Sequence, residues 1–226
     1  MLKLHGFAVS NYFNMVHLAL LEKGIEFETV TAYPNNSEEF LAHSPRGKVP
    51  FLQTEFGYIN ETSAILDYLE DSQGGRPLLP SEPFARAQVR TLMKEIELYI
   101  ELPARLCFAE AFFGGTVPQA VKTKAELELR AGFATLKRHA RFAPYVAGDS
   151  FSLADIYFLY SAGIATQVAK TLFQFDPLED QPQARALLKQ LGENLHVQKI
   201  AAEREVAMPA FIAYVQAKQY NLHSEP

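Results

Sequence analysis

The sequence predicts a chain of two parts, an α/β domain followed by an all-helical domain. Over residues 1–76, short runs in which apolar and polar residues alternate are interspersed with helical patterns. Residues 74–83 are rich in glycine and proline, which is typical of a connection between domains. Beyond them, apolar residues recur every three or four positions, which predicts helices.

The first domain begins with a predicted βαβ unit. Leu2 and Leu4 alternate with polar residues, as in a short strand. Ser10 can cap the helix that follows, and Gly24 can end it. Residues 25–29 alternate again and predict a second strand. Because a helix separates the two strands, we expect them to pair in parallel.

Three further elements complete this domain. A short helix is predicted over residues 37–43. A hairpin follows, in which residues 51–54 and 58–59 turn around Gly57. A last helix is predicted over residues 61–71. The predicted order is therefore βαβαββα.

The rest of the chain is predicted to form a bundle of helices. Pro103 is expected to kink or end one of them, because proline lacks a backbone donor and clashes with the previous turn. Further helices are expected to begin at Ser152, near Gln183 and near Pro209. The predicted boundaries are 1–76 for the α/β domain, 77–84 for the linker and 85–226 for the helical domain.

The composition argues against several functional classes. The net charge is −5, with 21 basic and 26 acidic residues, which gives no general attraction to nucleic acid or anionic membranes. No segment approaches the roughly 18–20 apolar residues of a membrane span, and the N-terminus lacks a signal-peptide pattern. The histidines show no ligand spacing, so no metal site is expected. Cys107 is the only cysteine, and we expect its side chain to be buried. The low cysteine content also favours a reducing, cytoplasmic location.

The segment from residue 46 to residue 69 combines two features of a peptide-binding site. Pro50 stands at the entrance to an apolar strand, where a backbone edge could pair with an extended peptide. Further along, Glu61 and Thr62 begin a helix. The free N–H groups of a helix start suit a carboxylate, and the carboxylate of Glu61 suits a neighbouring ammonium group. The segment therefore predicts a site for a small zwitterionic peptide.

A second motif, residues 148–156, predicts a folding element. Ser152 followed three residues later by Asp155 is a variant of the capping box, in which aspartate replaces the usual glutamate or glutamine. Phe151 and Ile156 stand where a hydrophobic staple would lie. We expect Asp155 to be largely buried and hydrogen-bonded to the backbone.

Together, the βαβαββα domain, the linker, the helical domain and these two motifs resemble the cytosolic glutathione transferases. The resemblance covers the whole chain. It implies a thioredoxin-like N-terminal domain that binds glutathione and a C-terminal helical bundle domain that shapes the pocket for a second substrate. It also implies glutathione as co-substrate with no other cofactor, a small hydrophobic electrophile or peroxide as second substrate, and a homodimer.

The resemblance assigns the cysteinyl-glycine end of glutathione to residues 48–50. A cis bond before Pro50 is a family hallmark, and it would leave the N–H and C=O of Val49 free to pair with the peptide. Only about 5–6% of X–Pro bonds in folded proteins are cis, so this expectation rests on the resemblance. Lys48 is expected to pair with the glycyl carboxylate, with Arg46 as a weaker candidate.

The resemblance assigns the γ-glutamyl end of glutathione to Glu61 and Thr62. In the family this pair is commonly Glu-Ser, and here it is Glu-Thr. Threonine also has a hydroxyl group, so it can donate a hydrogen bond to the ligand just as serine does.

The resemblance places activation of the glutathione sulfur at the start of the first helix, where the serine-type position falls on Ser10. Lowering a thiol pKa by two units requires about 2.7 kcal/mol. A hydrogen bond to a charged group contributes about 1.5–3 kcal/mol and a helix N-terminus about 0.3–1 kcal/mol, so both together suffice. Asn11 is the alternative donor, and Tyr12 fits the spacing less well. Asn11 and Asn14 stand where the family often has proline and arginine.

Two other functions stay open at this point. A glutathione-dependent disulfide reductase of this fold would use Asn11, and a non-catalytic member would serve binding or regulation. The intact pairs at 49–50 and 61–62 argue against a non-catalytic protein. The basic residues between 137 and 141 are interpreted as complementing a helix dipole. Candidates for an acceptor pocket, equally well explained as core or dimer contacts, are Tyr99, Phe108, Phe112 and Phe113.

Overall fold

The computed structural model describes residues 1–72 and 74–222, with side chains as far as residue 217. Its contacts divide the chain into two compact units. The first consists of residues 1–76 together with the chain from Asn194 onward, and the second is Pro77–Glu193. Each unit is described by itself.

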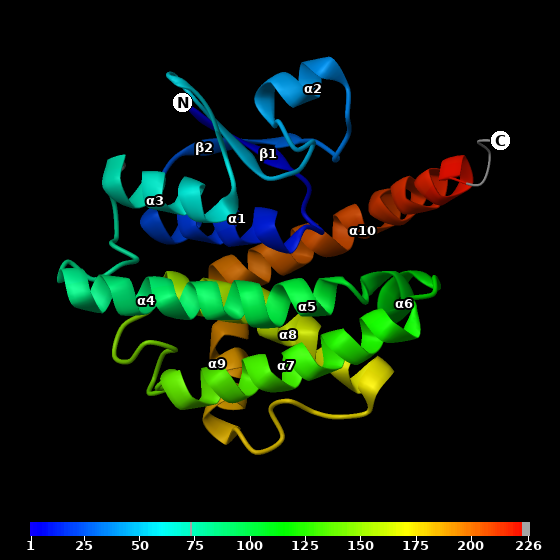
Figure 1. Ribbon diagram of the computed structural model, residues 1–226. Helices are drawn as coiled ribbons and strands as arrows, with labels where there is room; N and C mark the ends of the chain where they lie inside the picture. The colour runs from blue at the N-terminus through cyan, green and yellow to red at the C-terminus, as the bar shows by residue number, and fades with distance from the viewer. Residues whose placement is uncertain (73, 223–226) are drawn as a thin grey trace. The chain divides into compact units, whose positions relative to one another are not determined.

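The first unit contains a four-stranded sheet in the order β2-β1-β3-β4 (Figure 1). Strands β1 (Leu2–Gly6) and β2 (Phe27–Thr31) pair in parallel, which confirms the predicted βαβ unit. Strand β3 (Phe51–Thr54) runs antiparallel to β1 and forms a hairpin with β4 (Gly57–Asn60), as predicted.

Helices cover both faces of this sheet. Figure 1 shows α1 (Asn11–Lys23) and α3 (Thr62–Ser72) on one face and α2 (Glu38–His43) on the other. Leu4 and Leu52, which are paired neighbours on β1 and β3, are fully buried. Their burial follows from the period of two along each strand, which turns alternate side chains toward the same face.

The ends of the first helix form as the sequence predicts. Ser10 is the N-cap of α1, and Gly24 ends the helix in the left-handed conformation with φ 67°. The start of α3 differs from the prediction. The helix begins at Thr62, because Glu61 has a φ of 66° and so lies outside the helical region.

A long C-terminal helix, α10 (Leu195–Leu222), belongs to the first unit. The expected helix start near Pro209 is wrong, because Pro209 lies inside α10. The helix starts earlier because Asn194 caps it: the Asn194 Oδ1 accepts hydrogen bonds from the N–H of His196 at 2.7 Å and of Val197 at 3.3 Å. Proline is tolerated here because Pro209 is exposed, so water can satisfy the carbonyl that loses its partner.

This helix also changes the expected division of the chain. The segment 85–226 was expected to form one helical domain, whereas α10 packs on α1. Its first turn is attached to α1 by the Asn194 Nδ2, which donates to the Glu22 Oε1 at 2.7 Å. Nothing in the periodicity of α10 distinguishes a helix that packs on its sequence neighbours from one that returns to the N-terminal domain.

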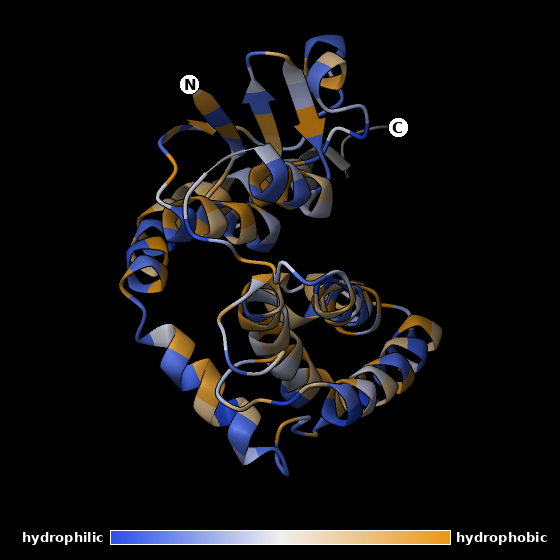
Figure 2. Cartoon of the chain, turned by 90° about the vertical axis from the view of Figure 1, so that its left-hand side faces the viewer, coloured by the Kyte–Doolittle hydropathy of each residue, from blue (hydrophilic) through white to orange (hydrophobic). Residues whose placement is uncertain are grey.

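The second unit is all-helical. Its apolar residues (orange in Figure 2) are interspersed with polar residues (blue), as expected for helices that bury one face. At its centre lies α8 (Leu153–Phe173), whose side chains Ile156, Tyr157 and Phe158 are fully buried. The helical segments are α4 (Pro83–Ile96), the π-helical turn η1 (Glu97–Glu101), α5 (Leu102–Arg105), α6 (Phe108–Phe113), α7 (Gln119–His139), α8 (Leu153–Phe173) and α9 (Pro182–Gly192).

The predicted interruption at Pro103 takes the form of a π-helical turn. Regular α-helix ends at Ile96, and η1 precedes the proline. Pro103 has no N–H to donate to the carbonyl of Tyr99, four residues earlier. Gly132 of α7 packs against this carbonyl so closely that an added Cβ would lie 2.1 Å from the Tyr99 oxygen. The glycine therefore allows the two helices to approach where proline disrupts the regular pattern.

The expected linker, residues 77–84, is packed into the second unit rather than exposed along its length. Leu78 and Leu79 are buried, and the N–H of Leu153 donates to the Leu78 carbonyl at 3.0 Å. Helix α4 already begins at Pro83. The composition correctly indicated irregular backbone, but the two leucines supply apolar surface that anchors it.

The prediction for Asp155 is confirmed. The side chain is fully buried, and its Oδ2 accepts from the Ser152 N–H at 2.8 Å. Its Oδ1 accepts from the N–H of Val146, also at 2.8 Å, which attaches the preceding loop to the start of α8. Burial raises the pKa of Asp155 to about 6, against the lowering effect of these hydrogen bonds.

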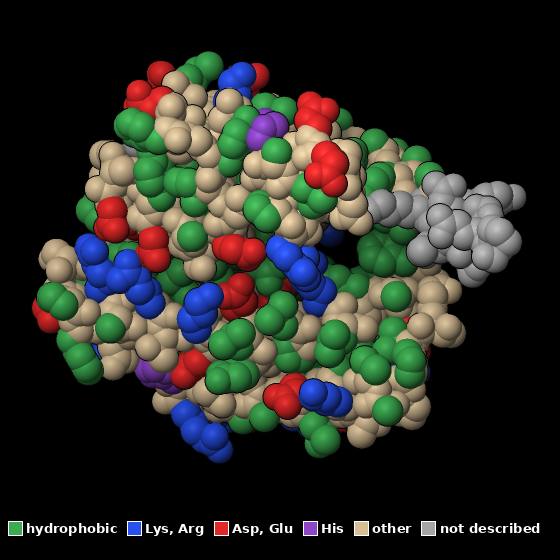
Figure 3. Space-filling view, turned by 45° about the horizontal axis from the view of Figure 1, so that its top comes forward, with side chains coloured by type: hydrophobic (Ala, Val, Ile, Leu, Met, Phe, Trp, Pro, Cys, Tyr) green, Lys and Arg blue, Asp and Glu red, His purple; other side chains and the backbone are tan. Residues whose placement is uncertain are grey.

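The surface carries charges of both signs. Figure 3 shows acidic and basic side chains interspersed on the visible face. This mixture fits the small net charge and gives no extended region of one sign on that face. None of the described helices is long and apolar enough to cross a membrane.

Candidate functional site

Strand register brings the predicted site segments of the first unit to one edge of the sheet. His5 near the end of β1 pairs with Phe51 at the start of β3, and Phe51 pairs with Asn60 at the end of β4. The chain leaves this edge toward Ser10, enters it from Val49, and leaves it again into Glu61. Three segments far apart in the sequence therefore meet at one place.

The loop between β1 and α1 presents Ser10 at the helix start. The Ser10 N–H donates to the Phe7 carbonyl, and the Ser10 Oγ accepts from the N–H of Phe13 at 3.4 Å. Since the hydroxyl group acts as acceptor in this bond, its own proton is available for a second partner. Asn11 is the first residue of α1, so both candidate donors lie at the positive end of the helix.

Sequence reasoning missed the contribution of Asn14. This side chain is only 1% exposed, and its Nδ2 donates to the Ala8 carbonyl at 2.9 Å. The bond connects the first turn of α1 back to the loop that carries Ser10. The available signal was an asparagine in place of arginine at this position, which the sequence alone did not explain.

The segment before β3 has the backbone geometry of a peptide-binding edge. The Val49–Pro50 peptide bond is cis. Among the residues that the structure describes, none forms a hydrogen bond with the Val49 backbone. The preceding turn is fixed by the Ser44 Oγ, which donates to the Lys48 carbonyl at 2.7 Å and accepts from the Lys48 N–H at 3.2 Å. The side chains of Arg46 and Lys48 are exposed.

A glycine allows this turn to lie close to its neighbour. Gly47 has a φ of 62°, and a Cβ at this position would lie 2.5 Å from the Asn35 carbonyl oxygen. Both the left-handed conformation and the close approach therefore require glycine.

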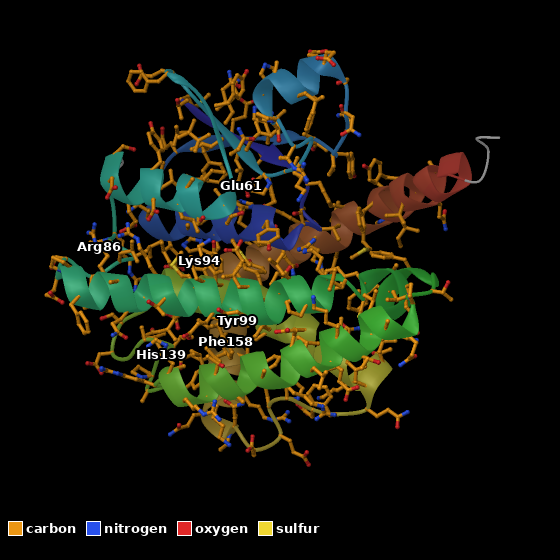
Figure 4. The ribbon with its side chains drawn as sticks, viewed as in Figure 1. Glu61, Arg86, Lys94, Tyr99, His139 and Phe158 are labelled. Atoms are coloured by element: carbon orange, nitrogen blue, oxygen red, sulfur yellow. The ribbon has the colours of Figure 1, made fainter. Side chains whose placement is uncertain are left out.

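The start of α3 is strained at its first candidate residue. Glu61, labelled in Figure 4 where β4 joins α3, has a φ of 66°, a conformation that costs a residue with a Cβ about 1–3 kcal/mol. Glu61 is exposed, whereas Thr62 is only 6% exposed. The Glu61 carbonyl accepts from the N–H of Ile65 at 3.0 Å, so the strained residue is held by the helix. Strain of this kind clusters at functional sites.

An aromatic stack connects the Ser10 loop with α10. The ring of Phe7 lies 5.2 Å from that of Phe211 and 4.9 Å from that of Tyr33. Tyr33 in turn stacks on Tyr214 at 4.5 Å, and the Tyr214 hydroxyl donates to the Pro34 carbonyl at 2.8 Å. These contacts join residues about 200 positions apart, and no short motif predicts them.

Helix α1 also contains a buried histidine. His17 is 3% exposed, and burial, with a smaller effect of Lys199, lowers its pKa to about 4. The Oε2 of Glu203 lies 3.7 Å from the His17 Nδ1, which is too far for a hydrogen bond. His17 is therefore neutral at physiological pH and is part of the packing between α1 and α10.

Other residues weighed in the sequence have structural positions. Cys107 is fully buried, as expected, and burial raises the pKa of its thiol. Tyr99 and Phe113 are partly exposed, at 44% and 37%. In the part of the chain that the structure describes, no group of three or more His, Cys, Asp or Glu side chains is arranged to hold a metal ion.

Comparison with known proteins identifies the family. Residues 4–77 match the family described as "Glutathione S-transferase, N-terminal domain". A protein of Pseudomonas putida named "Glutathione S-transferase" is 57% identical over 96% of this chain and 99% of its own. A "Stringent starvation protein A homolog" of Pasteurella multocida is 31% identical over 65% of this chain and 66% of its own.

Solved structures agree with this result. The crystal structure of Gtt2 from Saccharomyces cerevisiae superposes with a TM-score of 0.70 at 26% identity, and covers 88% of this chain and 99% of its own. The match extends over the α/β and the helical parts, so it is not limited to a thioredoxin-like domain. The chain belongs to the glutathione S-transferase family.

Proposed function

We propose that this glutathione transferase binds glutathione at the sheet edge formed by the ends of β1, β3 and β4. The observation that carries the proposal is the register of His5, Phe51 and Asn60, which gathers the three candidate segments. In this arrangement the backbone of Val49 pairs with the cysteinyl part of glutathione, as in strand addition. Glu61 binds the γ-glutamyl ammonium group.

Thr62 and Lys48 complete the proposed recognition. Thr62 begins α3, so its N–H and hydroxyl groups can donate to the γ-glutamyl carboxylate at the positive end of the helix. Lys48 pairs with the glycyl carboxylate. Because both ends of the peptide are held, the cysteinyl sulfur is directed to the start of α1.

The proposed reaction begins with a thiolate that Ser10 stabilises. A free thiol with a pKa of about 8.5 is only about 3% ionised at pH 7. The Ser10 hydroxyl donates to the sulfur while it accepts from the N–H of Phe13, and the helix end adds its dipole. The thiolate then attacks a small hydrophobic electrophile or a peroxide, with glutathione as co-substrate and no other cofactor.

The Ser10 assignment is tested by the pKa of the bound thiol. Ser10→Ala should raise that pKa and lower turnover below pH 7 by about 10–100-fold, with a smaller change in glutathione affinity. The pKa is measured from the ultraviolet absorbance of the thiolate in the binary complex. Asn11→Ala is the matched variant. If it raises the thiol pKa and Ser10→Ala does not, Asn11 is the donor, as in the disulfide-reductase alternative.

Loss of the helix cap is controlled separately. Ser37 caps α2 in the same way, by accepting from the N–H of Phe40 at 3.3 Å. Ser37→Ala also removes the bond that the Ser37 hydroxyl donates to the Asn35 Oδ1 at 2.8 Å, so it should lower stability at least as much as Ser10→Ala while the thiol pKa stays unchanged. A shift of that pKa in Ser37→Ala would attribute the effect to the fold and not to the Ser10 hydroxyl.

A non-catalytic role is the alternative function. The stringent starvation protein relative has a name that does not denote a transferase, but it is less similar than the Pseudomonas putida transferase. Retention on immobilised glutathione decides between the two. A folded protein that neither binds this resin nor conjugates a chloronitrobenzene would favour the non-catalytic role. The proposal also includes a homodimer and a cytoplasmic location, as is common for such enzymes.

A further inference from the structure

A cavity lies entirely within the helical unit. It has a volume of about 580 Å³, within the range of about 300–1,000 Å³ that is usual for small-molecule sites. Its walls come from the segment before α4, the first turns of α4, and the loop between α7 and α8. No residue of the proposed glutathione site lines it, so the two sites share no residue.

The bottom of this cavity is apolar. Leu78, Val89 and Leu92 line it and are each no more than 3% exposed. Phe84 also lines it, and 71% of this residue is exposed. A large exposed aromatic ring beside these buried apolar side chains offers a surface on which a flat apolar group can stack.

One cation on the cavity wall has no acidic partner. Arg141 lines the cavity and forms no ion pair with any residue that the structure describes. Its Nη1 lies 3.4 Å from the position that a Cβ would take on Gly148, so the guanidinium group rests against the loop backbone. An aspartate, Asp149, also lines the cavity without pairing with it.

The neighbouring histidine does not compete for an anion. The Nδ1 of His139 lies 2.9 Å from the Glu95 Oε2, and its Nε2 lies 2.9 Å from the Gln88 Oε1. Figure 4 labels His139 at the end of α7, beside α4. Since Glu95 already balances any charge on the imidazole, Arg141 is the cation left to bind a ligand among the described residues that line the cavity.

The loop that carries Arg141 is rigidly attached to the core. The Arg141 N–H donates to the Val146 carbonyl at 2.9 Å, and the Val146 N–H donates to buried Asp155. Phe142, between them, has a φ of 51° and is buried. A strained, buried residue in a closed loop fixes the position of its neighbour, which reduces the entropy lost when a ligand binds.

We propose that this cavity binds a small monocarboxylate with an apolar, preferably aromatic, body. The carboxylate pairs with the Arg141 guanidinium in the two-pronged geometry typical of arginine, and the body lies on the leucines and Phe84. A cavity wall with one available cation, and with the carboxylate of Asp149 also on it, disfavours ligands that carry two or more negative charges, such as phosphates and dicarboxylates. The basic cluster at the end of α7 thus has a binding role in addition to its effect on the helix dipole.

The test is a calorimetric titration of the protein with 3-phenylpropionate. The amide of the same acid is titrated in parallel as the uncharged probe. Wild-type protein should bind the acid in the micromolar to millimolar range and the amide about tenfold more weakly. Arg141→Gln should remove the preference for the acid over the amide, because it removes the positive charge and leaves the apolar side chains of the cavity in place. Arg138→Gln, an exposed arginine of the same cluster that does not line the cavity, is the matched control and should bind as wild type.

Two outcomes would overturn the proposal. One is equal affinity of the acid for wild-type protein and Arg141→Gln, and the other is absence of binding to wild-type protein at millimolar concentrations. A second variant, Ala85→Phe, fills the cavity from α4 and should abolish binding of both probes while the melting temperature stays within a few degrees. Because glutathione binding is measured in the same variants and should not change, failure here leaves the glutathione site unaffected.

Discussion

Substitution of Asp155 tests the energetic account of the helical unit. Asp155→Ala leaves the N–H groups of Val146 and Ser152 buried without their acceptor. Each such group costs about 1–3 kcal/mol, so the free energy of unfolding should fall by about 2–6 kcal/mol. This exceeds the 1–2 kcal/mol of an ordinary cap, because the carboxylate also holds the loop before α8.

The same residue should give a distinctive pH dependence. The pKa of Asp155 is raised from 3.8 to about 6 in the folded protein, so the folded state binds more protons than the unfolded state between these values. The cost of the ionised carboxylate is therefore fully present above pH 6 and is relieved as the pH falls. Between pH 7 and pH 5 the contribution of Asp155 to the free energy of unfolding should rise by about 1.3 kcal/mol.

Urea unfolding of wild-type protein and Asp155→Asn at pH 7 and pH 5 measures this contribution of Asp155 to the free energy of unfolding. The amide has the shape of the carboxyl group but cannot titrate, so the difference between the two proteins isolates Asp155. From pH 7 to pH 5, the free energy of unfolding of the wild type should rise by about 1.3 kcal/mol relative to that of the variant. A constant difference between pH 7 and pH 5 would refute the reasoning from burial.

Three further predictions concern the first unit. The pKa of His17 is lowered from 6.5 to about 4, so the unfolded state binds more protons than the folded state between these values. Acidification from pH 7 to pH 5 should therefore lower the free energy of unfolding of the wild type by about 1.8 kcal/mol relative to His17→Gln, as measured by urea unfolding. Asn14→Ala removes the bond to Ala8 and should lower both the melting temperature and turnover, with stability reduced by about 1–3 kcal/mol. Tyr214→Phe removes the bond to the Pro34 carbonyl and should lower the free energy of unfolding by about 0.5–1.5 kcal/mol, measured by thermal unfolding, and an unchanged value would exclude a contribution from that bond.

Local signals explain why much of the fold could be predicted. Ser10 and Gly24 specify the two ends of α1 through caps that involve only adjacent residues. The parallel pairing of β1 and β2 follows from the helix between them, and burial of Asp155 follows from a four-residue motif. In each case the interaction that decides the structure lies within a few positions of the residue that signals it.

The features that escaped prediction have no signal in the type of the residue concerned. Pro209 marks a helix boundary by its intrinsic preference, yet it lies within α10 because that helix is stabilised by packing on α1. The role of Asn14 depends on the Ala8 carbonyl, whose direction is set by the loop. The left-handed conformation of Glu61 likewise has no signal in a residue type that rarely adopts it.

The return of α10 to the first unit has a consequence for synthesis of the chain. Residues 77–193, which form the other unit, separate the sheet from the helix that completes its packing. At roughly 5–20 residues per second, a ribosome needs about 6–23 s to make these 117 residues. During that time Phe7 and Tyr33 have been translated but Phe211 and Tyr214 have not. The rings of Phe7 and Tyr33 therefore stay uncovered on the nascent chain until the last helix emerges. A chaperone can bind this aromatic surface during that time.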